Sequence, residues 1–74
     1  MRIYGYTRKA GQDDDPSEMG EVTFQATPNE LRKIASFMTR VAEIMEEHGG
    51  SFGHEHYRDY TKGAGRAPDI VVSR

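Results

Sequence analysis

The 74-residue sequence predicts a small, two-layer α+β domain in which one amphipathic helix packs on a short, mainly antiparallel sheet. One strongly marked helix over residues 28–48 and short β-favouring segments on either side of it support this prediction. A lone helix needs one apolar sheet face to cover it. We therefore expect the element order ββα(β)β in a single domain spanning residues 1–74.

The first third of the chain predicts two strands. Residues 2–8 are rich in Tyr, Ile and Thr, which favour extended structure. Residues 20–26 alternate, with Val22, Phe24 and Ala26 on one face. The turn-forming residues 9–18 between them predict a loop, so an antiparallel hairpin is the simplest arrangement.

The helix has clear start and stop signals. Thr27 is a good N-cap, Pro28 suits the first helical position, and Glu30 completes a capping box. Gly49 and Gly50 end the helix. Phe37 and Ile44 widen an apolar stripe formed by Leu31, Ile34, Ala35, Met38, Val41, Ala42 and Met45. The opposite side carries Arg32, Lys33, Ser36, Arg40, Glu43 and Glu47.

The last third is less regular. A short strand over about residues 54–59 is one alternative for a segment that has no helical stripe. Residues 61–68 predict a loop, and residues 70–72 a final buried strand.

Composition excludes several classes of protein. The chain has no cysteine, which rules out disulfides and thiolate zinc sites. A net charge of −2 does not suggest binding to nucleic acid or an anionic membrane, and no apolar run approaches a membrane span. No signal peptide is visible, so we expect a cytoplasmic protein. Because so short a chain has a thin core, a homodimer stays open.

The sequence His54-Glu55-His56 admits two interpretations. On a strand, both histidines would project to one face and could bind a metal, with Asp59 or His48 as a third ligand. The favoured interpretation is polar sheet residues that bind no metal, because two histidines without a fixed third ligand are a weak signal. The consecutive residues Asp13, Asp14 and Asp15 lack the alternating pattern of a calcium loop, and we expect no cofactor.

The sequence also argues against an enzyme. No serine lies in a strand-turn-helix elbow, and neither glycine-rich stretch continues as a phosphate-binding loop. A chain of this size rarely encloses a pocket of several hundred cubic ångströms.

Tyrosines are the better guide to function. Tyr4, Tyr6, Tyr57 and Tyr60 are numerous for so small a chain without tryptophan. Tyr is enriched in protein interfaces, although these rings could instead line the edge of a thin core. Tyr57 and Tyr60 lie among basic residues, but neighbouring acids cancel much of that charge, which disfavours a single-stranded nucleic acid partner.

The sequence resembles the small immunity proteins of bacterial polymorphic toxin systems, in family thirty-two. The Phe-Gly-His-Glu-His stretch and the following Asp-Tyr are the more specific part of the resemblance. The residues that carry it are Ile3, Gly5, Tyr6, Glu21, Val22, Thr23, Pro28, Glu30, Leu31, Ile34, Ala35, Phe37, Phe52, His54, Glu55, His56, Asp59, Tyr60, Pro68, Asp69, Ile70, Val71 and Val72.

The resemblance implies a non-catalytic protein that neutralises a toxin encoded next to it by direct binding. We expect the contact on an open sheet face and the stretch from His54 to Tyr60. The expected partner-binding residues are Tyr4, Tyr6, His54, His56, Tyr57, Asp59 and Tyr60. The alternatives are a small metal-binding protein or metal-dependent enzyme using His54 and His56, and a homodimeric structural or regulatory domain.

Overall fold

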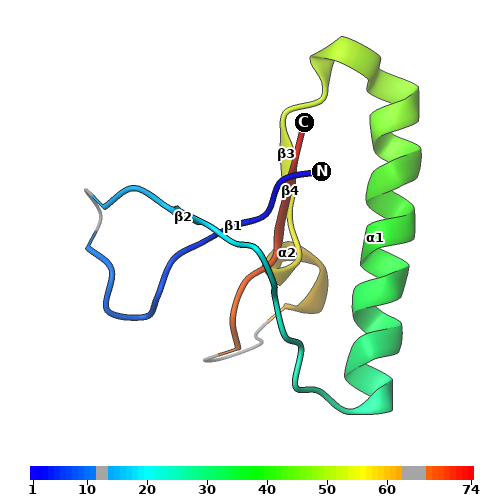
Figure 1. The fold of residues 1–74 in the computed structure, drawn as a ribbon. Coiled ribbons are helices and arrows are strands. Elements are labelled where there is room, and N and C mark those ends of the chain that lie inside the picture. Colours follow the sequence, from blue (N-terminus) through cyan, green and yellow to red (C-terminus); the bar gives the residue numbers. More distant parts are fainter. Residues whose placement is uncertain (12–13, 63–66) are drawn as a thin grey trace.

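The computed structural model describes residues 1–11, 14–62 and 67–74. Figure 1 shows the long helix on one side and a two-stranded sheet beside it. The part of the chain that carries β1 and β2, called the N-terminal arm below (residues 4–11 and 14–18), projects away from the helix. This arrangement confirms the predicted α+β class. In chain order the elements are β1 (Tyr4–Gly5), β2 (Ser17–Glu18), α1 (Pro28–His48), a 3₁₀ turn η1 (Gly49–Ser51), β3 (His54–His56), α2 (Arg58–Thr61) and β4 (Val71–Ser73).

The ends of α1 match the sequence prediction. The Thr27 hydroxyl accepts a hydrogen bond from the Glu30 amide at 3.2 Å, and the Glu30 carboxylate accepts one from the Thr27 amide at 2.9 Å. Two amides at the helix start are thereby satisfied. At the other end Gly49 has φ 52°, a left-handed backbone that glycine adopts without strain. Local sequence therefore fixes both ends of the helix.

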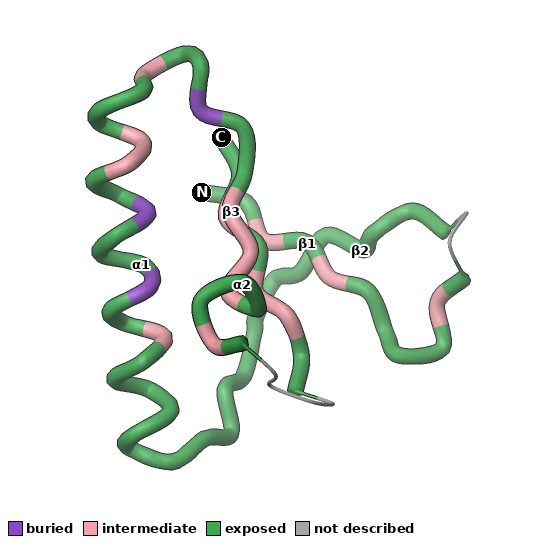
Figure 2. The backbone as a smooth tube through the Cα atoms, turned by 180° about the vertical axis from the view of Figure 1, so that it is seen from behind, coloured by how far each residue is buried: buried purple, intermediate pink, exposed green. Residues whose placement is uncertain are grey.

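The core is small and lies where α1 meets β3 and β4. Its buried side chains are Phe37, Val41 and Phe52. The half-buried residues packed around them are Ile44, Met45, Tyr57, Ile70 and Val72. Figure 2 shows the buried positions on the side of α1 that faces β3. Phe37, expected at the margin of the apolar stripe, thus lies at its centre, while Leu31 and Met38 are exposed.

The strands form two separate sheets instead of one. β1 and β2 pair antiparallel, with Tyr4 opposite Glu18 and Gly5 opposite Ser17. β3 and β4 also pair antiparallel, with Glu55 opposite Val72 at the centre. Among the described residues, the core cluster draws on the β3–β4 sheet and its flanks, through Tyr57, Ile70 and Val72, and not on β1 or β2, so α1 covers a sheet of two short strands.

The predicted strand over residues 20–26 is wrong. The structure places β2 at Ser17–Glu18, inside the segment predicted as a loop; after the Met19 amide bonds the Ile3 carbonyl, residues 21–27 form no strand and no helix. The predicted strand over 2–8 shortens to Tyr4–Gly5 for the same reason: its partner ends after two residues. Alternation marked residues 20–26 as able to form a strand, but a strand also needs a neighbour to bond.

The predicted strand over 54–59 is correct only in its first half. After β3 the chain turns at Tyr57 into α2, because the Arg58 amide bonds the Asp69 carboxylate and the Tyr60 amide bonds the Tyr57 carbonyl. The last strand is shifted by one residue and is less buried than predicted, since Val71 is exposed and Val72 half-buried.

The remaining predictions concern two loops and the absence of a membrane span. The loop predictions at Asp13 and at residues 63–66 lie outside the described residues. No helix in the described parts of the chain combines the length and apolarity needed to cross a membrane.

We expect Val41→Ala to lower the free energy of unfolding by about 2 kcal/mol, because it leaves a cavity in a core of three buried side chains. Thr39→Ala, at an exposed position of the same helix, should change it by less than about 0.5 kcal/mol. Urea denaturation at equal protein concentration measures both values. Equal losses in the two variants would show that α1 does not depend on this core.

Candidate partner-binding groove

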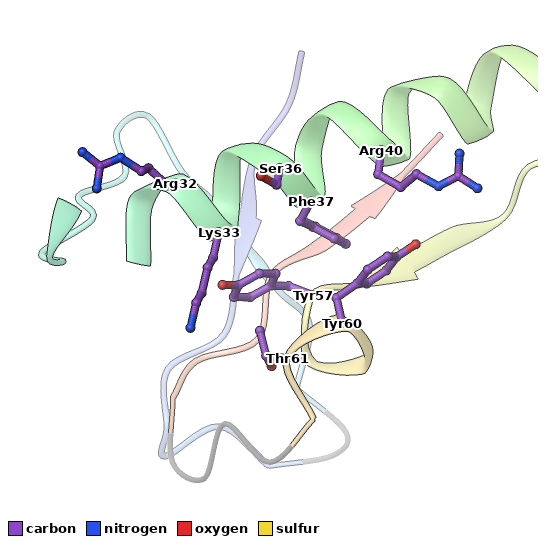
Figure 3. A pocket seen from close by; sticks show the side chains of 8 residues that line it. All are labelled: Arg32, Lys33, Ser36, Phe37, Arg40, Tyr57, Tyr60 and Thr61. Carbon is purple, nitrogen blue, oxygen red and sulfur yellow. The ribbon is translucent and has the colours of Figure 1, made fainter. Parts of the chain in front are cut away.

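α1 and α2 border an open groove of about 470 Å³. Figure 3 shows Phe37 descending from α1 toward Tyr57 and Tyr60, which come from the β3–α2 turn and from α2. The side chains that line the groove are Arg32, Lys33, Ser36, Phe37, Arg40, Tyr57, Tyr60 and Thr61.

Three aromatic rings form the floor of the groove. The Phe37 ring lies 5.2 Å from the Tyr57 ring and 5.1 Å from the Tyr60 ring, centroid to centroid. Their planes are inclined at 59° and 67°, as in the tilted and edge-to-face pairs that aromatic quadrupoles favour. Phe37 is buried, whereas Tyr60 remains 44% exposed. The groove therefore offers a supported aromatic surface to an incoming group.

The rim of the groove is basic. Lys33 and Arg40 flank the rings at either end, and Arg32 points away from them (Figure 3). Arg40 also makes an exposed ion pair with Glu43, at 3.3 Å. Among the residues that the structure describes, no acidic side chain lines the groove. Sequence analysis placed these cations on the solvated side of the helix and did not connect them with a binding site. Lys33 lies four residues before Phe37 and Arg40 three residues after it, a spacing that could have indicated that both flank the Phe37 ring.

A second polar cluster joins β3 to the segment before β4. His56 Nδ1 lies 2.6 Å from Asp69 Oδ2, while Asp69 Oδ1 accepts hydrogen bonds from the backbone amides of Arg58 and Ile70, each at 2.9 Å. An ionised carboxylate only accepts hydrogen bonds, so His56 Nδ1 carries the hydrogen. Asp69 thus holds the start of α2 against β3, and places Tyr57 and Tyr60 under α1.

The environment of Asp69 shifts its acidity. Burial acts to raise the pKa of this carboxyl, but the hydrogen bonds from His56, Arg58 and Ile70 outweigh it and lower the pKa below its ordinary value. A lowered folded-state pKa means that the ionised form stabilises the fold above the unfolded-state pKa. That stabilisation disappears as pH falls through the folded-state value.

The histidines do not assemble a metal site in the described parts of the chain. The rings of His54 and His56 lie edge to face at 5.1 Å. Neither His48 nor Asp59 joins them in a group of three metal-ligating side chains among the described residues. Asp69, in the segment just before β4, is the hydrogen-bond partner of His56.

The structure divides the expected partner-binding residues among the groove, β3, the exposed side of α2 and the N-terminal arm. Tyr57 and Tyr60 line the groove. His54 and His56 lie on β3, and Asp59 is exposed on α2. Tyr4 and Tyr6 are 52% and 64% exposed on the N-terminal arm and do not line the groove.

We expect Asp69→Asn to be less stable than the wild type at pH 7, by about 1 kcal/mol, because the charge that strengthens three hydrogen bonds is gone. The difference should shrink as pH falls below the ordinary carboxyl value of about 4. Urea midpoints at pH 7 and pH 3 measure it, with the exposed Asp59→Asn as control. A difference that does not vary with pH would show that the Asp69 charge is not the stabilising element.

Comparison with known families gives one match. Residues 21–74, well over half of the chain, match the family described as Immunity protein 32. The match begins after the β1–β2 arm and includes α1, β3, α2 and β4. No curated protein and no solved structure matches the chain. Because the match covers the helix, the groove and the Asp69 cluster together, the chain belongs to the Immunity protein 32 family.

Proposed function

We propose that the protein is a non-catalytic inhibitor that neutralises a cognate bacterial toxin by binding it directly, in the cytoplasm of the cell that makes both. Membership of an immunity-protein family is the observation that carries this proposal. From the resemblance to polymorphic toxin systems, we propose that the toxin gene lies beside this one. An inhibitor of this kind needs only a recognition surface, which a domain of this size can offer.

The groove between α1 and α2 is the part of that surface with the strongest physical case. Tyr and Arg are the residues that dominate the energetics of interfaces with transient partners. The groove combines the half-exposed Tyr60 ring with Lys33 and Arg40 at its ends. An acidic toxin segment that inserts one apolar side chain over the rings would satisfy both features.

The other expected contact residues extend this surface. His54 and Asp59 are exposed on β3 and α2, the two elements that flank Tyr57 in the chain. We propose that a partner seated in the groove also contacts these two side chains. Tyr4 and Tyr6 would add a second contact through the arm. We propose that Tyr57 and Tyr60 contribute most, because α1 supports their rings from behind.

The direct test combines the purified protein with the product of the adjacent toxin gene. We expect a one-to-one complex at micromolar concentration, loss of toxin activity in vitro, and rescue of growth when both genes are expressed in a bacterial host. Growth inhibition that this protein does not relieve, together with no complex at 10 µM, would contradict the proposal.

We expect Tyr60→Ala to weaken toxin binding by about thirtyfold, as loss of a central aromatic contact does. Lys33→Glu should weaken it as well, and its effect should diminish at high salt. Calorimetric titration measures both, with circular dichroism to verify folding. Thr39→Ala, at an exposed position of α1 that does not line the groove, is the control and should leave binding unchanged. Tyr6→Ala, on the arm, should weaken binding less than Tyr60→Ala; a large loss there and none at Tyr60 would move the contact away from the groove.

A further inference from the structure

The chain exposes more surface than a compact protein of its mass. Its accessible surface is 6481 Å² for 8.4 kDa, whereas a compact monomer of this mass exposes about 4,600 Å². The radius of gyration is 13.3 Å, against about 11.3 Å for a compact 74-residue domain. The excess of about 1,900 Å² is more than twice the roughly 800 Å² that each partner contributes to a standard interface.

Part of this excess is one side of α1. The 21-residue helix is about 31 Å long, but the strands beside it have three residues each and cover about 10 Å. Phe37 and Val41 face the sheet, while Leu31 and Met38 are 45% and 39% exposed. With the exposed Ala35 and Ala42 they form an open flank of α1, on which large and small apolar side chains alternate at helical spacing.

The segment before the helix is also uncovered. Val22 and Phe24 are 45% and 50% exposed, and they alternate as strand residues do. In the described parts of the chain, no hydrogen bond joins the backbone of residues 21–26 to another strand. Backbone groups of this kind commonly find a strand partner.

We propose that a second copy of this chain covers both surfaces, in a two-fold dimer formed by the open flank of α1 and residues 21–26. A two-fold interface uses the same patch on both subunits, so it must be self-complementary. Residues 21–26 of the two subunits can pair antiparallel across the axis, and the two open flanks of α1 can pack on each other, so each patch meets its own copy. Their apolar character also resembles a permanent homodimer interface more than a transient one.

The proposed dimer leaves the groove accessible. At about 100° per residue, Leu31, Ala35 and Met38 fall on one side of the buried ridge, whereas Lys33 and Arg40 fall on the other. The toxin-binding proposal and the dimer proposal therefore use different flanks of the same helix, and either can fail without the other.

Sedimentation equilibrium of the full chain from 1 to 100 µM tests the dimer. We expect a mass twice the 8.4 kDa of one chain at the upper concentrations. Phe24→Glu and Met38→Glu should give monomers at all of them, because each places a charge in the apolar interface. Thr23→Glu is the matched control: it adds the same charge on the opposite face of residues 21–26 and should leave the dimer intact.

A wild type that remains a monomer at 100 µM would overturn the proposal, as would dimers that survive both glutamate substitutions. If a glutamate variant loses its helical circular dichroism, Phe24→Ala or Met38→Ala replaces it, with at least tenfold weaker dimerisation expected. Tyr60→Ala, in the groove, should stay dimeric. A loss of toxin binding in Tyr60→Ala with the dimer preserved would separate the two functions of α1.

Discussion

The contact of Phe37 and Val41 with the β3–β4 sheet is the constraint on which the structure depends. Among the described residues, these two side chains and Phe52 are the buried hydrophobic core, and the half-buried side chains around them pack against it, so the apolar burial that offsets chain entropy is centred on this contact. The same contact supports the groove, because the Phe37 ring that faces the core also lies against Tyr57 and Tyr60. Stability and recognition thus share one side chain.

A core this narrow leaves α1 with two free flanks of different chemistry. One carries Lys33 and Arg40 beside the tyrosines and suits a charged, reversible partner. The other carries Leu31 and Met38, for which water is an unfavourable neighbour. The proposed toxin inhibitor would gain from this division, since the proposed second subunit would stabilise the fold while the groove stays accessible.

Sequence predicted best what local interactions determine. The Thr27–Glu30 capping box and Gly49 fixed α1 to the residue, because every group involved lies within one turn. The strands were predicted less well, since pairing depends on distant residues. Alternation at Val22 and Phe24 predicted a strand, but the described parts of the chain provide no strand for it to pair with. The turn at Tyr57 depends on Asp69, twelve residues away, which no local pattern reveals.

The difference between local and long-range interactions also explains which residues of the groove the sequence could indicate. Tyr57 and Tyr60, which line the groove, were expected at a partner contact from residue type alone, because tyrosine suits an interface wherever it lies. Lys33 and Arg40 were not, because exposed cations on a helix are ordinary until a second element places aromatic rings beside them. That element is α2, which Asp69 ties to β3 through His56 and the Arg58 amide. Within the His-Glu-His stretch, His56 therefore has a structural role: its hydrogen bond helps to hold the Asp69 carboxylate that positions α2 beside the groove.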